Sequence, residues 1–484
     1  MNRTLMVSTL VIMVSTTYLY AEESLPLKSV NKANKVIDAA LVAHGGAENH
    51  SAISSIEQQS KFTNYAVNQS RLPNPPWDKS ESAGFSAVDF EKNIFVTRNS
   101  GAGSGFDFNN ATVINGADSW QLNFRNGTAA PIAQPDFNTS SGPFVRVTAP
   151  LLMKQLQSRR QSSHWLGVEQ YNGRPHDVVT LVMEVGPGLS LYFDQETSML
   201  TRMERVLPPF GQVEYRFEDY EMVAGVAVNN SFHLLINGDA NIDIANSNTR
   251  INQPIDSYAV IPDHLNKIAA VTPDNFNIKE IDEGVFLVGG AGTYGLFIEM
   301  QDHIVAIGGT LGVAARLEEV RKHIADKPLR YGVLTHHHSD HIPGAADYAS
   351  EGATIITFEP NKDLVLAATG DENAKLEFIE DGMTLSDGNR VIELIDIGPT
   401  PHTEQMLIVY LPEEKIIFEA DHFGVPRTGP IPAASETTQA FAKALDHLGL
   451  DFDKIVGAHS PRVGSPDDLK TAIKTRPAVL ASAH

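Results

Sequence analysis

The sequence contains no cysteine among its 484 residues. This absence excludes disulfide bonds, zinc sites built on thiolates and cysteine nucleophiles. A metal ion in this protein would therefore have to be held by histidine and carboxylate side chains, which are the other common ligands of divalent metals. The chain has 17 histidines and 59 acidic residues, so such ligands are plentiful.

Basic residues are scarce relative to acidic ones. The chain has 37 Lys and Arg against 59 Asp and Glu, which gives a formal net charge of −22 at pH 7. A surface of this sign repels the phosphate backbone, so we expect no nucleic-acid partner. The hydrophobic content of 42% is that of an ordinary globular protein, and a length of 484 residues predicts two or three domains.

Long apolar runs are also missing, except at the N-terminus. Met1–Arg3 is a short positive start, Leu5–Val14 is largely apolar, and Ala21 precedes two glutamates. This pattern is typical of a secretory signal peptide over residues 1–21 and predicts an exported bacterial protein, periplasmic or secreted. Leu19 stands where the cleavage site favours a small residue, so an uncleaved membrane anchor is the alternative.

A β-rich domain is predicted over residues 22–262. It opens with a helix at residues 29–43, where apolar residues recur at helical spacing and Gly45–Gly46 follows as a stop signal. From Ser54 onward, short runs rich in β-branched and aromatic residues are separated by turn sequences such as Asn-Gly. This pattern predicts a mostly antiparallel sheet, with a helix inserted near residues 150–160.

After a linker at residues 263–275, strands and helices are expected to alternate over residues 276–484. Strands are expected at residues 285–288, 295–300, 304–307, 331–334, 354–358, 391–397, 406–411, 415–419 and 454–456. Helices are expected at residues 314–325, 345–351, 437–448 and 465–474. This alternation predicts a layered α/β domain with sheets inside and helices outside.

The densest group of candidate metal ligands follows one of these apolar strands. Residues 335–341 read Thr-His-His-His-Ser-Asp-His. His336 and His338 alternate, so both can point to the same side of an extended segment. Asp340 and His341 lie in the turn that follows, from which they can face a second ion, since two-metal sites hold their ions about 3.5–4 Å apart.

Three more candidates stand where predicted strands end, namely His402, Asp421 and His459. The ends of strands are where α/β folds collect catalytic groups. A single histidine at a strand end is more often an ordinary hydrogen-bonded residue than a ligand. The joint pattern of one dense cluster and three strand-end residues favours a metal site, and its imidazole and carboxylate groups suit zinc, iron or manganese.

The motif His336-x-His338-x-Asp340-His341, with the three later residues, resembles the signature of the metallo-β-lactamase superfamily. The resemblance covers residues 276–459 and implies an αββα sandwich with two metal ions at one edge of its sheets. It also implies two ligand sets joined by one bridging carboxylate: His336, His338 and His402 for the first ion, Asp340, His341 and His459 for the second, and Asp421 between them.

Two features depart from the family pattern. Members usually carry an acidic residue at the end of the early strand that here ends in Gly308-Gly309, so a hydrogen bond that supports a ligand is expected to be missing. His337 and His422 neighbour the ligand positions but match none of them. We expect these two histidines to lie behind the ligands or at the surface.

The resemblance implies a hydrolase in which a hydroxide shared by two Zn²⁺ ions attacks an ester, lactone or amide of a small molecule. Asp340 would then orient the hydroxide or return its proton to the leaving group. The alternatives are a mononuclear iron enzyme similar to the sulfur dioxygenases of the superfamily, a β-lactamase, and a binding protein without activity.

The predicted β-rich domain contains all three tryptophans of the chain, Trp77, Trp120 and Trp165. Aromatic side chains often line pockets for apolar ligands, although core packing is their more frequent use. We therefore expect this domain to help select a hydrophobic or aromatic substrate. A purely stabilising or dimerising role is the simpler alternative.

Overall fold

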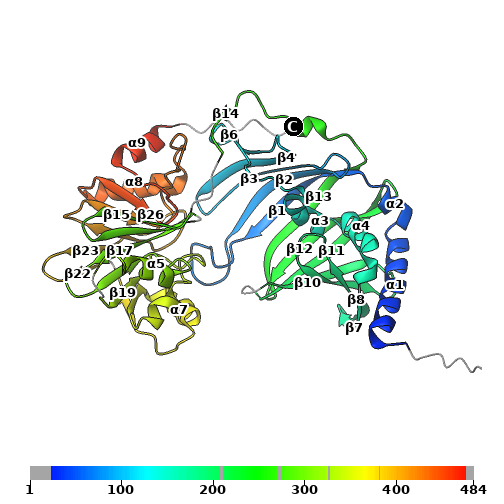
Figure 1. The fold of residues 1–484 in the computed structure, drawn as a ribbon, viewed down its shortest axis with the longest axis horizontal. Helices are drawn as coiled ribbons and strands as arrows, with labels where there is room; N and C mark the ends of the chain where they lie inside the picture. Colours follow the sequence, from blue (N-terminus) through cyan, green and yellow to red (C-terminus); the bar gives the residue numbers. More distant parts are fainter. Residues whose placement is uncertain are drawn as a thin grey trace, which may run out of the picture.

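The computed structural model describes residues 23–207, 211–270, 275–290, 292–324, 327–380 and 382–475. The predicted signal peptide at residues 1–21 lies outside these ranges. The described chain forms one very large sheet in its N-terminal half and a pair of smaller sheets in its C-terminal half (Figure 1). Within the described ranges, no helix has the length and apolar character needed to cross a membrane.

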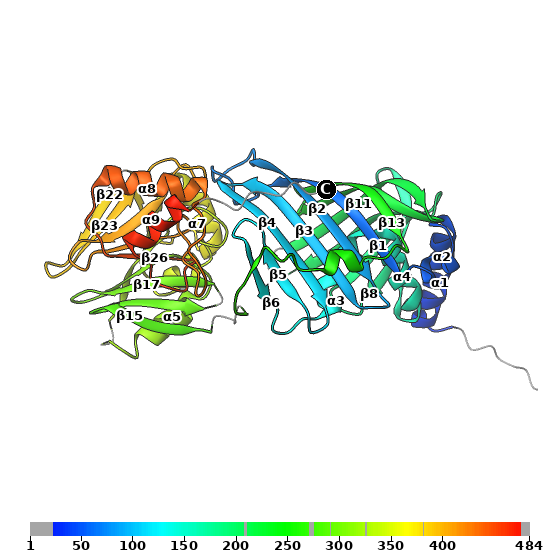
Figure 2. The ribbon, with the colours of Figure 1, turned by 90° about the horizontal axis from the view of Figure 1, so that it is seen from above.

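The N-terminal half is built on a 14-stranded sheet, which confirms the predicted mostly antiparallel β-domain. Its long central strands lie side by side in Figure 2. All its neighbouring strands pair antiparallel except β14 and β6. In sheet order, the strands are β14 (Asn266–Lys267), β6 (Thr128–Pro131), β5 (Trp120–Asn123), β4 (Phe106–Asn115), β3 (Ile94–Gly103), β2 (Lys79–Asp89), β1 (Ser55–Tyr65), β13 (Asp239–Ile251), β12 (Val226–Ile236), β11 (Gly211–Val223), β10 (Leu200–Leu207), β9 (Gly188–Asp194), β8 (Arg174–Val182) and β7 (Trp165–Tyr171).

Helices cover the end of this sheet that is remote from the C-terminal half (Figure 1). The helix expected at residues 29–43 is α1 (Leu25–Ala43), whose first turn is capped by the Ser24 hydroxyl. The helix expected near residues 150–160 is α4 (Ala149–Ser158). Two further helices, α2 (Ala47–Ser51) and α3 (Phe137–Val147), were not predicted. The interior Pro143 of α3 explains its weak signal, because proline disfavours helix interiors.

The segment expected to be a linker contains the short strand β14. Its backbone pairs with β6 through hydrogen bonds from Asn266 N to Gly127 O at 2.8 Å and from Ile268 N to Ala129 O at 2.9 Å. The neighbouring Leu265 is buried in an apolar cluster on the same sheet. A strand of two residues is too short to show an alternation of apolar and polar residues, so this pattern could not predict it.

The C-terminal half consists of a seven-stranded and a five-stranded sheet with helices outside them, which confirms the predicted layered arrangement. Buried apolar residues from both sheets form one cluster between them, and separate clusters lie beneath the helices. The first sheet has the order β15 (Asn277–Asp282), β16 (Val285–Gly290), β17 (Thr293–Glu299), β18 (Ile304–Ile307), β19 (Leu329–Val333), β20 (Thr354–Phe358) and β21 (Leu376–Ile379). The second has the order β22 (Gly382–Ser386), β23 (Val391–Asp396), β24 (Leu407–Leu411), β25 (Ile416–Glu419) and β26 (Lys454–Gly457). The helices are α5 (Val313–Val320), α6 (Ala345–Ser350), α7 (Lys362–Thr369), α8 (Glu436–Leu448) and α9 (Pro466–Lys474).

The prediction of a helix over residues 314–325 was wrong at its C-terminal end. The helix α5 ends at Val320, and a tighter turn follows in which His323 N donates to Val320 O at 2.9 Å. Helix α7 was not predicted, and neither were strands β15, β21 and β22. All three are edge strands, so their outer sides face solvent and their apolar pattern is weak.

The two halves meet where strands β1 to β4 reach the C-terminal sheets (Figure 1). Residues 66–78, which connect β1 to β2, are called the docking loop below. Ser339 N donates to Asn68 O in this loop at 3.0 Å, and Thr437 N donates to Gly105 O at the tip of the β3–β4 hairpin at 3.3 Å. A Cβ on Gly105 would lie 2.1 Å from Thr437 Oγ1, so this approach requires glycine.

Candidate metal centre

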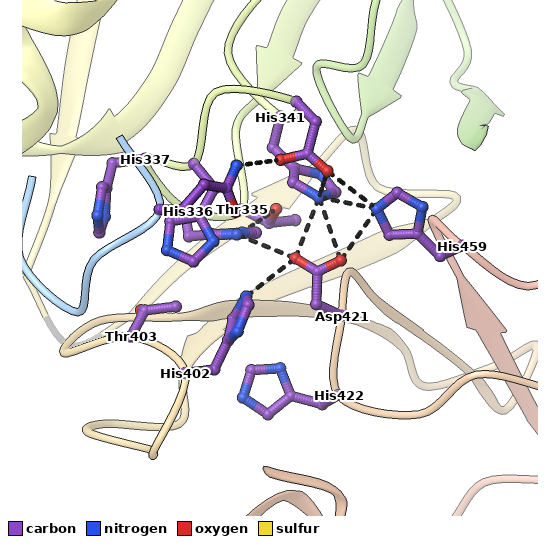
Figure 3. Close-up of polar contacts among 12 residues, drawn as sticks. Thr335, His336, His337, His341, His402, Thr403, Asp421, His422 and His459 are labelled. Carbon is purple, nitrogen blue, oxygen red and sulfur yellow. Dashed lines mark hydrogen bonds and ion pairs between the residues drawn. The ribbon is translucent and has the colours of Figure 1, made fainter. Parts of the chain in front are cut away.

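All seven predicted ligands come together where strands of both C-terminal sheets end (Figure 3). The dense motif lies between β19 and α6, and the three later residues follow β23, β25 and β26. The side chains form two groups, each able to hold one ion. The first contains His336, His338, His402 and Asp421, and the second contains Asp340, His341, His459 and the same Asp421.

The Asp421 carboxylate lies at the centre of the arrangement. Its Oδ2 lies 3.0 Å from His336 Nε2 and 3.2 Å from His402 Nε2. Its Oδ1 lies 3.0 Å from His459 Nε2, and His341 Nε2 lies near both oxygens, 3.1 Å from Oδ2 and 3.3 Å from Oδ1. Ligand atoms around a tetrahedral Zn²⁺ lie roughly 3.3 Å from one another, because each bond is about 2.0–2.1 Å long. The donor set and its spacing therefore fit one ion on each side of this carboxylate.

The two groups differ in their access to solvent. His336 and His338 are buried, whereas the side chains of Asp340 and His459 are 46% and 35% exposed. Asp340 Oδ2 lies 3.4 Å from His341 Nε2 and 3.3 Å from His459 Nε2. The second group is therefore the side from which water and a substrate can enter.

Two of the candidate ligand histidines are oriented by backbone carbonyls. His459 Nδ1 lies 3.1 Å from Gly292 O, and His338 Nε2 lies 3.0 Å from Ser70 O. A carbonyl only accepts hydrogen bonds, so each keeps a proton on the facing nitrogen and leaves the other nitrogen free to bind a metal. His459 thereby offers Nε2, and His338 offers Nδ1.

Burial and charge shift the pKa values of individual histidines in opposite directions. Burial lowers the pKa of His338 to about 3, so its imidazole is neutral. Burial also disfavours the charged forms of His341 and His459. The nearby carboxylates of Asp421 and Asp340 outweigh this penalty and raise their pKa values to about 9 and about 10. Without an ion, the second group therefore holds protons at neutral pH.

His422 lies behind His402 and not at the surface (Figure 3). Its Nε2 lies 3.1 Å from the Thr400 hydroxyl oxygen. The same oxygen accepts hydrogen bonds from the backbone N–H groups of His402 and Thr403, both at 3.2 Å. His422 thus fixes the turn that carries a ligand.

Glu419 has a role that the sequence analysis missed. It ends strand β25, is fully buried, and accepts hydrogen bonds from the backbone N–H groups of His422 at 2.6 Å and Phe423 at 3.2 Å. Burial raises the pKa of this carboxyl to about 8. The side chain therefore holds the turn that presents Asp421. In the sequence, Glu419 is a lone acidic residue in an otherwise apolar strand, and this placement could have indicated its role.

Packing requires glycine at position 309, just after strand β18. Gly309 has a φ of +66°, and a Cβ there would lie 2.3 Å from both His341 O and Leu334 Cδ2. The backbone of the histidine-rich turn thus rests directly on this glycine. The buried Nδ1 atoms of His341 and His402 have no hydrogen-bond partner among the described residues, in line with the expected loss of a supporting contact.

His337 contacts the N-terminal half of the protein. Its Nε2 lies 2.8 Å from Ser70 O in the docking loop, and its side chain is buried. Figure 3 shows its ring turned away from the cluster around Asp421. His337 therefore lies behind the candidate ligands, which is one of the two positions that we expected from the sequence.

Two further residues of the N-terminal half reach the ligands. Gln69 Nε2 donates to Asp340 Oδ1 at 2.9 Å. The ring of Phe106 packs edge-on against His402, with centroids 5.4 Å apart. Nothing in the local sequence indicated these contacts, because they arise only when the two halves pack together.

The comparisons with known proteins agree with this geometry. Residues 289–459 match the model of the metallo-beta-lactamase superfamily, and this range contains all seven residues of the two groups. The C-terminal part of the chain therefore carries a metallo-β-lactamase superfamily domain.

Individual relatives cover only parts of the chain. The alpha subunit of 2,4-dinitroanisole O-demethylase from Nocardioides sp. (strain JS1661) is 27% identical over 142 residues, which are 29% of this chain and 43% of that protein. A metallo-beta-lactamase from Pontibacter korlensis has 19% identity and a TM-score of 0.34, covering 41% of this chain and 96% of its own. The flavodiiron protein from Giardia intestinalis has 18% identity and a TM-score of 0.32, covering 42% of this chain and 58% of its own.

The two groups should differ in how pH affects metal binding. At neutral pH an ion entering the second group must displace protons from His341 and His459, whose pKa values are about 9 and about 10. His338, with a pKa of about 3, imposes no such competition in the first group. The affinity of the second group should therefore rise with pH up to about 10, and more steeply than that of the first group. Zinc titrations of the metal-free protein against a chromophoric chelator measure both, and an equal pH dependence would contradict this assignment.

Proposed function

We propose that the C-terminal domain is a hydrolase that uses two divalent metal ions, with Zn²⁺ as the resident ion. The pair of His and Asp groups that share Asp421 is the observation that carries this proposal. A carboxylate between two sets of imidazoles suits ions that lie a few Å apart. Histidine-rich donor sets with one side open to solvent are typical of catalytic zinc.

Divalent ions at these groups would activate water at neutral pH and stabilise developing negative charge. Asp340 is the side chain best placed to act on that water. Burial disfavours its charge, but hydrogen bonds from His341 and His459 hold its pKa well below its usual range, so it is ionised and can accept a hydrogen bond. Gln69 holds Oδ1 in place, so Asp340 can orient the attacking water and pass its proton to the leaving group.

We propose an uncharged small molecule with a hydrophobic or aromatic part as the substrate, carrying an ester, lactone or amide bond. Support comes from Phe106, which brings an aromatic ring from the N-terminal half against His402. Trp77 lies in the docking loop, whereas Trp120 and Trp165 pack against apolar clusters within the N-terminal half. The net charge of −22 disfavours polyanionic substrates. The signal peptide predicted at residues 1–21 is the basis for proposing a site of action outside the cytoplasm.

A substrate panel tests the reaction class. It should contain a lactone series, an aryl ester, an amide, a thioester, a chromogenic β-lactam and a phosphodiester. The panel should also contain an aryl methyl ether, because the Nocardioides relative is named as a 2,4-dinitroanisole O-demethylase. We expect turnover of lactones or carboxylic esters that is lost on chelation and restored by zinc. Turnover of the β-lactam alone would favour a β-lactamase, and no turnover by fully zinc-loaded protein would favour a binding protein.

Metal content tests the two-ion proposal separately from the substrate. Protein purified without chelators and supplied with zinc should contain two zinc ions per chain by elemental analysis, one for each group. Protein from unsupplemented cells shows the native metal. One iron per chain would favour the oxygenase alternative, and the absence of any bound metal after zinc loading would contradict the proposal.

Substitution of a first-group ligand should abolish turnover. His338→Ala removes a buried ligand, so we expect a loss of more than about 100-fold in kcat/KM, which is roughly 2.7 kcal/mol of transition-state stabilisation. The matched control is His447→Ala, because His447 is exposed in the last turn of α8 and belongs to neither group of candidate ligands. Circular dichroism should show both variants folded. A folded His338→Ala variant within about tenfold of wild-type activity would be incompatible with the ligand assignment.

A further inference from the structure

We propose that the docking loop of the N-terminal half is a positioning element of the metal centre. In this proposal the Ser70 carbonyl selects the nitrogen that His338 presents to the first ion. The metal centre would then be completed by both halves of the chain and not by the C-terminal domain alone. This inference rests on the proposed function, because it concerns a ligand of one of the two ions.

The Ser70 carbonyl accepts hydrogen bonds from two imidazoles of the C-terminal half. His337 Nε2 lies 2.8 Å and His338 Nε2 lies 3.0 Å from the oxygen, and all three residues are buried. A carbonyl oxygen has two lone pairs, so it can accept both hydrogen bonds. Both imidazoles are therefore held as the tautomer that is protonated on Nε2.

The other nitrogen of His338 then faces the cluster. Its Nδ1 is buried and has no partner among the described residues. The ring centroid of His338 lies 4.5 Å from that of His336 and 4.4 Å from that of His402. Among the described residues, Ser70 O is the only hydrogen-bond partner of His338 Nε2. Without the docking loop, no described residue would hold the His338 ring in this orientation and as the tautomer that is protonated on Nε2.

Hydrogen bonds within the docking loop fix the position of that carbonyl. The Ser70 hydroxyl donates to Ala66 O and accepts from Asp78 N, both at 2.8 Å, and so ties the two ends of the loop together. The Asp78 carboxylate accepts from Arg71 N at 2.7 Å. The loop is therefore a closed unit that presents its carbonyls outward.

The loop is also attached to the C-terminal half on both sides of Ser70. Asn68 O accepts from Ser339 N, and Arg71 O accepts from Glu404 N, each at 3.0 Å. The Arg71 guanidinium adds an ion pair of 2.5 Å with Glu404. Together with Gln69, which donates to Asp340, the loop contacts one ligand of each metal group.

Replacing the loop tests the proposal. Tyr65 and Lys79 form the last residue pair of the β1–β2 ladder, so residues 66–78 can be exchanged for an asparagine–glycine pair that closes the hairpin directly. A milder variant, Ser70→Ala with Arg71→Ala, removes the loop's internal tie and its ion pair while keeping the carbonyl. The control is Arg125→Ala, which removes another contact between the halves, a hydrogen bond from Nη1 to Ala433 O of 2.8 Å.

The readouts are the zinc affinities of the two groups and the absorption spectrum of the cobalt-substituted protein. Partners behind metal ligands typically contribute about 10- to 100-fold to metal affinity. We expect the loop replacement to weaken zinc binding at the first group by about this factor, because the Ser70 carbonyl is lost, and to alter the cobalt spectrum. Loss of Gln69 should also weaken zinc binding at the second group. The double variant should lie between the loop replacement and wild type, and Arg125→Ala should match wild type.

The outcomes separate this inference from the proposed function. If wild-type protein binds two zinc ions and both loop variants, folded by circular dichroism, bind them with wild-type affinity and spectrum, the inference is wrong and the proposed function stands. Failure of wild-type protein itself to bind zinc would overturn both. An equal loss in Arg125→Ala would show that general packing of the two halves, and not the Ser70 carbonyl, governs the affinity.

Discussion

The carboxylate of Asp421 is the group around which the site is organised. Its side chain is only 13% exposed, and a buried charge is costly unless it is paired. Four imidazoles surround it within 3.3 Å. Burial disfavours its charge, but the charge of His341 and hydrogen bonds from His336, His341 and His402 outweigh burial and hold its pKa well below its usual range. A cluster of this kind, with the buried Glu419 holding its turn, is difficult to explain as ordinary packing. It is readily explained if divalent cations balance the carboxylates.

The rest of the architecture delivers side chains to that carboxylate. The two C-terminal sheets enclose an apolar cluster, and the ligands stand where their strands end. Gly309 lets the histidine-rich turn pack against the end of β18, and His422 fixes the turn that carries His402. The docking loop of the N-terminal half completes the surroundings of the site, because the Ser70 carbonyl accepts hydrogen bonds from both His337 and His338.

The sequence predicted the site better than it predicted the surroundings of the site. Ligand spacing is a local property for residues 336–341, and strand ends mark the positions of the three later ligands. The antiparallel sheet and most C-terminal elements were also predicted, because each has a clear apolar period. Edge strands, the Pro143-containing helix α3 and the two-residue strand β14 lack such a period. The contacts of Gln69, Ser70 and Phe106 could not be predicted, because they depend on how the two halves pack.

The most direct test of this account is crystallographic. Diffraction data collected on zinc-loaded crystals on either side of the zinc absorption edge locate the ions without any assumption about substrate or activity. The account predicts two anomalous peaks, one on each side of the Asp421 carboxylate, with His338 bound through Nδ1 and its Nε2 still directed at Ser70 O. A single peak coordinated by other residues, or the absence of any peak next to Asp421, would contradict the central claim that this carboxylate joins two metal ions.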